Sequence, residues 1–139
     1  MKLITQKELT GNLFNHPYEN NHDYFAAMSV VHISDDGKML IGYWHAPVGE
    51  VKLDYGANIE NIYVIKGKMR LVKPDGTEVV ASAGDILQCG GDYESVNCIV
   101  EEYVKALFIV YPQTEDDLAF VKRIEEKNEK PKFVLDDIL

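Results

Sequence analysis

Cysteine, basic charge and long apolar runs are all scarce in this sequence, and each shortage excludes a class of protein. The two cysteines, Cys89 and Cys98, form no CxxC pair and lie in no Cys/His cluster, so we expect thiols, at least one of them buried, and no zinc site. Against 23 Asp and Glu there are 14 Lys and Arg, and the formal net charge of −9 argues against a nucleic-acid partner. No run is long enough to span a membrane, and the N-terminus lacks the apolar core of a signal peptide. We therefore expect a cytoplasmic protein that binds neither nucleic acid nor membranes.

What is present fits one ordinary globular domain. The chain has 139 residues, of which 46% are hydrophobic and 27% charged, so we expect a single domain over residues 1–139. Residues 24–112 hold short runs of β-forming residues and are predicted to form a core barrel. Residues 1–23 read as an irregular arm that packs across a sheet, with room for an edge strand. Residues 113–139 are predicted to form a short helix, with Thr114 as a capping residue and Pro131 as its stop, and then an apolar tail that docks on the barrel or on a second subunit.

The stretch from residue 60 to residue 87 carries the clearest strand pattern. Three runs of β-formers are separated by turn residues, and a glycine in each separator supplies the positive φ that tight turns need. Gly84-Asp85 then opens a further run, Ile86-Leu87. The three predicted strands are residues 62–65, 69–72 and 78–81, with Lys66-Gly67-Lys68 and Pro74-Asp75-Gly76 as their separators.

The rest of the barrel region likewise consists of short runs of β-forming residues separated by turn residues. The last run is apolar almost throughout, so it is expected to be covered on both faces. Roughly nine short strands indicate an all-β sandwich or barrel rather than βαβ units. The additional predicted strands are residues 24–33, 38–45, 50–55, 95–100 and 103–111.

The motif residues resemble the cupin superfamily. Glu60 is followed seven positions later by Gly67, and Gly84-Asp85 precedes a strand, as in the two cupin motifs. The spacing over residues 40–111 is similar to small single-domain cupins related to (S)-ureidoglycine aminohydrolase and to ethanolamine-utilisation cupins. The resemblance implies a cupin-like antiparallel β-barrel, the jelly roll or double-stranded β-helix. It implies little about activity, because cupins host many unrelated chemistries.

The metal ligands that the resemblance implies are mostly missing. A cupin metal site uses an HxH pair, the first-motif Glu and a second-motif His. The HxH pair falls here on Leu53 and Tyr55, or on Asp54 and Gly56, and the second-motif His falls near Ser95. Only Glu60 remains, so we expect no metal and no cofactor. An alternative is a displaced metal site built from His45 and Glu60, and His32 and His45 lie on neighbouring predicted strands where they can face one another.

Strand alternation suggests which side chains face a cavity. If Glu60 faces inward as its family counterpart does, Ile62 and Val64 share its side while Tyr63 and Ile65 point away. The same matching directs Leu53 and Tyr55 inward. The candidate catalytic residues are Glu60 and Tyr55, and the candidate ligand-binding residues are Trp44, Ser95, Asn97 and Lys105. Each has a structural alternative: Glu60 as a turn cap in solvent, the aromatics as core, and Ser95 and Asn97 as exposed strand residues.

These observations favour a small-molecule-binding cupin that works without a metal. It is either an isomerase, lyase or hydrolase with Glu60 as acid or base, or a non-catalytic binding or assembly module, and the sequence leaves open whether it is an enzyme. No nucleophile–base pair supports covalent catalysis. The apolar strand at 103–111 and the apolar tail at 133–139 need covering, and cupins similar to this chain often pair through sheet faces, so we expect a homodimer.

Overall fold

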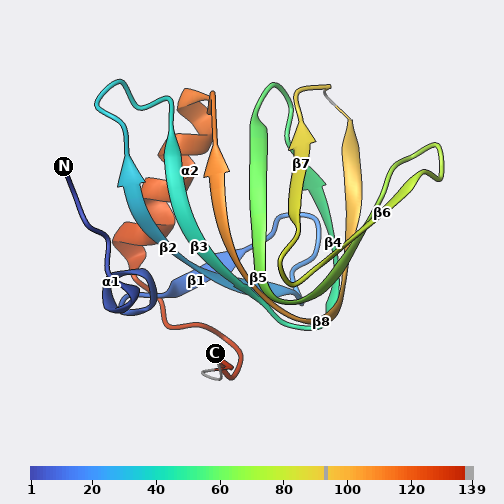
Figure 1. Cartoon of the computed structure of the whole chain (residues 1–139), viewed down its shortest axis with the longest axis horizontal. Helices are drawn as coiled ribbons and strands as arrows, with labels where there is room; N and C mark the ends of the chain where they lie inside the picture. The colour runs from blue at the N-terminus through green and yellow to red at the C-terminus, as the bar shows by residue number, and fades with distance from the viewer. Residues whose placement is uncertain (93, 137–139) are drawn as a thin grey trace.

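The computed structural model describes residues 1–92 and 94–136 and consists of a curved antiparallel sheet system with a helix along one side (Figure 1). The described chain contains eight strands, one fewer than the sequence suggested. In chain order the elements are α1 (Gln6–Thr10), β1 (Phe14–Pro17), β2 (Phe25–Ile33), β3 (Leu40–Ala46), β4 (Gly49–Asp54), β5 (Ile59–Val72), β6 (Glu78–Ser82), β7 (Ile86–Gly90), β8 (Ser95–Val110) and α2 (Glu115–Lys127).

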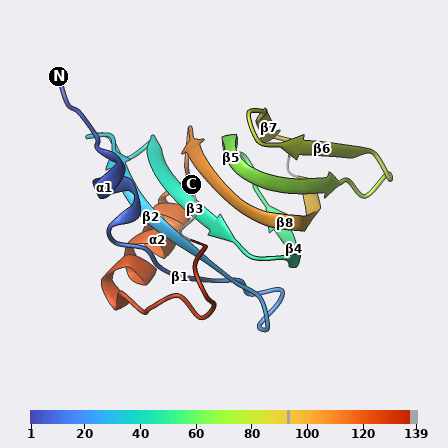
Figure 2. The same cartoon turned by 60° about the horizontal axis from the view of Figure 1, so that its bottom comes forward.

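Two long strands, β5 and β8, hold the barrel together. They pair with each other from Glu60–Val110 to Val72–Asn97, and all strand pairs are antiparallel. The second half of β8 pairs with β3 and its first half with β4, while the first half of β5 pairs with β7 and its second half with β6. The β5–β8 pair therefore passes from one wall of the barrel to the other, which Figure 2 shows as a continuous bend.

The bend lies at Gly67, where the sequence suggested a turn between two strands. Residues 62–65 and 69–72 belong to one strand, and the register between β5 and β8 shifts at Val64/Lys66, Lys66/Lys68 and Lys68/Met69. Gly67 has φ +91°, and a Cβ there would lie 2.1 Å from the carbonyl oxygen of Tyr103. Positive φ and a close backbone approach mark a β-bulge as readily as a turn, so the predicted break between the runs was wrong.

Among the other strand predictions, one boundary was wrong and two features are confirmed. Residues 95–100 and 103–111, predicted as two strands, are one strand, β8, which bends without breaking its pairing with β5. The hairpin predicted at Asp75-Gly76 is confirmed: Lys73 and Thr77 are hydrogen-bonded across it and Gly76 has φ +88°. No residue of β8 from position 103 to its end at Val110 is exposed, so this part of the strand is covered on both faces as expected, whereas Tyr111 of the predicted strand lies beyond β8 and is 55% exposed.

The two ends of the chain meet beside the barrel. The arm supplies the edge strand β1, which pairs with β2, and the backbone N–H of Asn15 donates to the carbonyl of Glu129 just after α2 (2.8 Å). The helix begins at its cap Thr114 as predicted, but it ends at Lys127, where Asn128 adopts a left-handed conformation (φ 48°), and not at Pro131. Neither described helix has the length and apolar character needed to span a bilayer.

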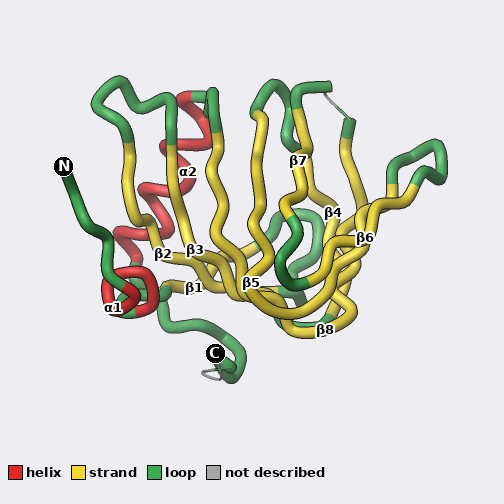
Figure 3. The backbone as a smooth tube through the Cα atoms, in the orientation of Figure 1, coloured by secondary structure: helices red, strands yellow, loops and turns green. Residues whose placement is uncertain are grey.

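An irregular C-terminal segment follows α2 and runs along the lower edge of the molecule in the view of Figure 3. Its Phe133 ring lies against the Tyr103 ring, with 6.1 Å between centroids, and the backbone N–H of Asp136 donates to the Tyr103 hydroxyl (3.1 Å). The described part of the tail therefore docks on the chain's own barrel. The last three positions of the predicted tail, 137–139, lie outside the described residues.

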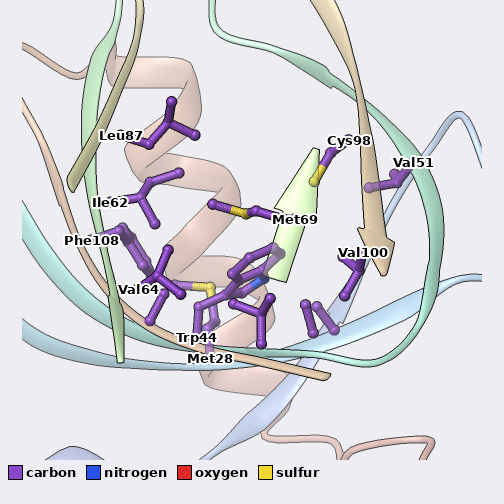
Figure 4. Close-up of a cluster of buried hydrophobic side chains, with 14 of the residues drawn as sticks. Met28, Trp44, Val51, Ile62, Val64, Met69, Leu87, Cys98, Val100 and Phe108 are labelled. Carbon is purple, nitrogen blue, oxygen red and sulfur yellow. The ribbon is translucent and has the colours of Figure 1, made fainter. Parts of the chain in front are cut away.

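The core lies between the two walls of the barrel. Side chains from β3, β5 and β8 converge there, among them Trp44, Ile62 and Phe108 (Figure 4). Cys98 is fully buried within the same core and Cys89 is half-buried, and both are free thiols. A cavity lies at one end of this core, and it contains the candidate site.

Candidate functional site

The main cavity has a volume of about 470 Å³ and opens at one end of the barrel. The inner faces of β3, β5 and β8 form its apolar wall, with Trp44, Ile62 and Phe108 among the contacts. Residues 16–20 of the arm close one side, and α2 with the loop before it closes another. The walls of the cavity thus come from the barrel and from both ends of the chain.

Glu60 points into this cavity from β5. Strand alternation gives the expected result: Ile62 and Val64 are buried on the same face, while Tyr63 and Ile65 are exposed on the other. Glu60 is half-buried, and no described Lys, Arg or His forms an ion pair with it. Desolvation raises the pKa of its carboxyl to about 7, a rise that the nearby Tyr55 hydroxyl partly offsets. The alternative of a solvent-exposed turn cap is therefore wrong.

A tight turn brings two further polar residues beside Glu60. The N–H of Asn58 donates to the carbonyl of Tyr55 (2.9 Å), and Gly56 within the turn has φ +57°. The Tyr55 and Asn58 side chains both line the cavity and are 9% and 7% exposed. Burial raises the pKa of Tyr55 well above its usual value, so its hydroxyl remains protonated.

Three buried polar atoms at this cavity make no well-formed hydrogen bond within residues 1–92 and 94–136: the Tyr55 hydroxyl, Oδ1 of Asn58 and Nδ1 of His16. The amide of Asn58 is fixed from its other side, because its Nδ2 donates to the carboxylate of Asp117 on α2. Desolvation lowers the pKa of His16 to about 4, so its ring is neutral at pH 7. Buried polar atoms are nearly always paired, so three such atoms around one cavity mark a place where a ligand or water can supply the partners.

Aromatic rings form much of the remaining wall. The indole Nε1 of Trp44 donates to the hydroxyl of Tyr18 (3.3 Å), which holds the two rings in a fixed relation. The His16 ring lies 4.5 Å from the Tyr18 ring and 5.7 Å from the Phe120 ring, measured between centroids. Trp44, predicted from the sequence as a ligand-binding residue, is thus both a core aromatic and part of the lining.

Three predicted site residues lie elsewhere. Ser95 and Asn97 are not part of the lining, because Val96 and Cys98 take the inward positions of β8 and Asn97 is exposed. Lys105 is buried on the opposite face of the sheet and lines a second cavity of about 270 Å³ beneath α1 and the C-terminal segment. The expectation that Ser95 and Asn97 form the opposite wall was therefore wrong.

The residues present do not fit a cupin metal ion. The positions at which the resemblance implies the HxH pair, Leu53 and Tyr55 or Asp54 and Gly56, hold no imidazole. Within the described ranges, no group of three His, Cys, Asp or Glu can hold a metal. His45 lines the second cavity and its Nδ1 lies 2.7 Å from the Tyr103 hydroxyl, so it shares no site with Glu60. His32 pairs with Ile41 while His45 pairs with Ala27, so the two histidines do not face one another.

Sequence reasoning missed His16, Tyr18, Asn58 and the contribution of α2. The arm and the helix carry no motif, and their approach to the cavity depends on contacts between distant parts of the chain, such as Asn15 with Glu129 and Asn58 with Asp117. The one available signal was the Tyr55–Asn58 turn, whose Gly56 places Asn58 two residues before the predicted pocket acid.

Comparison with known proteins agrees with this architecture. A family model described as an EutQ-like cupin domain matches residues 33–106, slightly more than half of the chain. Among solved structures, the EutQ protein of Clostridium difficile is 17% identical with a TM-score of 0.59, over 69% of this chain and 75% of that one. The ethanolamine utilization protein Q of Salmonella typhimurium is 16% identical with a TM-score of 0.61, over 72% and 80%.

The ectoine synthase of P. lautus is similar over a longer stretch, with 13% identity and a TM-score of 0.66 over 89% of this chain and 87% of that one. Among curated proteins, none matches the chain. At these identities the solved structures establish the fold alone. The predicted all-β jelly-roll barrel with a short C-terminal helix is confirmed.

Proposed function

The chain belongs to the family of EutQ-like cupin domains, and from that premise we propose that it binds a small polar or amphipathic molecule in the cavity around Glu60, without a metal ion. The observation that carries this proposal is the set of buried, unpartnered polar atoms around one half-buried acid. A buried polar atom that is left without any partner costs about 1–3 kcal/mol, which a ligand hydrogen bond would offset.

Catalysis by Glu60 is the sharper form of the proposal. A carboxyl group with a pKa of about 7 can both accept and return a proton near neutral pH, and Tyr55 stands beside it with a protonated hydroxyl. An isomerase, lyase or hydrolase reaction with Glu60 as general acid or base would use this pair. The alternative is a binding protein that keeps the same cavity and catalyses nothing. Both use the same residues, so only turnover distinguishes them.

The proposal that no metal is bound rests on the side chains around Glu60 that could coordinate one. A site that offers one carboxylate beside Leu53 and Tyr55 lacks the ligands that hold Mn, Fe, Ni or Zn against water. Elemental analysis of protein purified without chelator tests this. We expect well under about 0.1 equivalent of any of these metals per chain, and about one equivalent would favour the alternative of a metal-dependent cupin.

The binding proposal is tested by a thermal-shift screen of small polar metabolites, followed by a turnover assay of each hit. Glu60→Gln should remove turnover and weaken binding, because it keeps the shape of the side chain and removes the titrating group. Glu102→Gln changes an exposed acid outside the cavity and is the matched control. If Glu60→Gln behaves like Glu102→Gln for every hit, the site assignment is wrong.

Pairing of two copies is a separate part of the proposal. Tyr63, Ile65 and Ile86 are 44%, 41% and 71% exposed on the outer face of β5 and β7, and Tyr63 and Ile86 are register partners. An apolar patch on a sheet face that is offered to solvent favours a homodimer in which the same face of a second copy covers it.

A further inference from the structure

We propose that the ligand of the Glu60 cavity is a small organic cation, an amine that carries an apolar body. This inference rests on the proposed function, because it assumes that the cavity binds a small molecule. It goes further by naming the charge and the hydrogen-bonding sense of that molecule. Three independent features of the lining support it: the sign of the interior charge, the polarity of the unpartnered atoms and the aromatic walls.

Above the pKa of about 7 of Glu60, the charge inside the cavity is negative. Seven of the described lining residues carry charged side chains, five of them acidic, and six of the seven are exposed at the mouth. The seventh is Glu60, which lies inward and has no described cationic partner. A carboxylate held in an apolar surrounding without a counter-ion is stabilised by a ligand that brings the opposite charge. The remaining acids at the mouth, such as Asp54 and Asp116, favour the approach of a cation as well.

One of the unpartnered atoms, Oδ1 of Asn58, requires a hydrogen-bond donor. Because Nδ2 of Asn58 is engaged by Asp117, the atom left over is Oδ1, which only accepts. Asn58 is 7% exposed and lines the cavity, so this acceptor stays away from bulk water. The ionised carboxylate of Glu60 also only accepts, and the Tyr55 hydroxyl can accept while it donates elsewhere. An ammonium group offers up to three N–H donors to such a set, whereas a carboxylate offers none.

The walls suit a cation with an apolar body. Trp44 and Tyr18 are held together by their hydrogen bond, and Phe108 and Phe120 add two more rings to the lining. The face of an aromatic ring is negative, so it attracts an organic cation while it also buries the apolar part of that molecule. Arg123 provides an example at the mouth, where its guanidinium carbon lies 5.9 Å from the centroid of the Phe120 ring. The two cations of the lining, Lys52 and Arg123, are exposed and leave the interior uncompensated.

The test uses three probes of one shape and different charge: cyclohexylmethylamine, cyclohexylmethanol and cyclohexanecarboxylate. Trp44 is the single tryptophan of the chain and lines the cavity, so its fluorescence reports binding of each probe to the full-length protein. The titrations are run at pH 8, above the pKa of about 7 of Glu60. We expect the amine to bind about tenfold or more tightly than the alcohol, as a charge-assisted hydrogen bond allows, and the carboxylate more weakly than the alcohol.

Two variants then identify the source of the preference. Glu60→Gln should reduce the amine affinity to near that of the alcohol, so that the ratio of the two affinities falls toward one. Glu102→Gln, which removes the same formal charge from an exposed position outside the cavity, should leave the amine preference intact. Circular dichroism of both variants checks that a loss of binding does not come from unfolding.

The outcomes separate this inference from the proposed function. If the alcohol or the carboxylate binds as tightly as the amine, the cavity takes small molecules and only the cation inference fails. If the Glu60→Gln variant still prefers the amine over the alcohol, again only the cation inference fails. If no probe changes the Trp44 fluorescence up to about 10 mM, the weak-binding range for molecules of this size, both the inference and the proposed binding site fail.

Discussion

Glu60 and His16 line the same cavity, and burial moves their pKa values past one another. The carboxyl of Glu60 rises to about 7 and the imidazole of His16 falls to about 4, the reverse of the order that the two groups have in water. Between pH 4 and pH 7 both side chains are neutral, because the Glu60 carboxyl keeps its proton and the His16 ring has not yet gained one. The apolar surroundings penalise the charged form of each group, so the cavity favours this neutral pair.

The pair predicts two opposed slopes of stability against pH. The unfolded chain releases the Glu60 proton near 4.5 and the folded chain near 7, so this group stabilises the fold below pH 4.5 and loses that contribution as pH rises to 7. The unfolded chain protonates His16 near 6.5 and the folded chain near 4, so its contribution is full above pH 6.5 and is lost as pH falls to 4. The contribution of each group to the free energy of unfolding changes by at most about 3 kcal/mol over its interval. In the unaltered protein the two changes have opposite sign and largely cancel.

Single substitutions should reveal each slope. We expect Glu60→Gln to give a free energy of unfolding that increases between pH 4.5 and 7 relative to the unaltered protein, and His16→Asn to give one that decreases over a similar interval. Urea denaturation at half-unit pH steps measures both. Parallel curves for all three proteins would show that these groups are not desolvated.

Gly67 should be intolerant of any side chain. A Cβ at this position would meet the Tyr103 carbonyl oxygen at 2.1 Å, in a backbone with φ +91°, so Gly67→Ala is expected to destabilise the fold by more than about 3 kcal/mol. Gly76→Ala is the matched control, because Gly76 has φ +88° but a Cβ added there would meet no atom within 4 Å. Gly76→Ala should destabilise the fold by about 1–2 kcal/mol, which is the cost of holding an alanine in a left-handed backbone conformation without a steric clash. Equal melting temperatures for the two variants would contradict the close approach at the bend.

Tyr18→Phe should loosen the aromatic wall without removing a ring. The variant loses the acceptor of the Trp44 indole N–H, so we expect a loss of about 1 kcal/mol and a shifted Trp44 emission maximum. Tyr111→Phe removes a hydroxyl from a 55% exposed tyrosine outside the cavity and serves as the control. An unchanged emission spectrum for Tyr18→Phe would show that the two rings do not interact in solution.

Ile86→Asp should yield a monomer. The substitution puts a charge next to Tyr63 in the outer apolar patch that we assign to a second copy, while the side chain is 71% exposed, so the fold itself should tolerate it. Val134→Asp alters a 92% exposed residue of the C-terminal segment and should leave the dimer intact. Light scattering at micromolar concentration distinguishes the two. A monomeric unaltered protein would refute the dimer.

The family, the barrel and the inward direction of Glu60 were predictable, because they follow from spacing and strand alternation within one stretch. The bend at Gly67 was not, since a glycine between two lysines has the same appearance at a turn and at a bulge. Ser95 and Asn97 were placed by motif matching, although the alternation of Val96, Cys98 and Val100 already indicated the other face. His16 had no pattern around it at all. Its place depends on how the arm lies against α2, which no local rule describes.

The cavity draws on both chain ends, and more than half of its lining residues fall outside the stretch at 33–106 that the family model matches. The barrel is fixed by β5 and β8, whereas the arm and α2 touch it from outside and carry His16, Tyr18 and Asp117. The acid at the centre of the proposed site and the outer part of the lining therefore come from different segments of the chain. Substitutions in the two ends can reshape the lining around Glu60 without touching the strands that hold the barrel together.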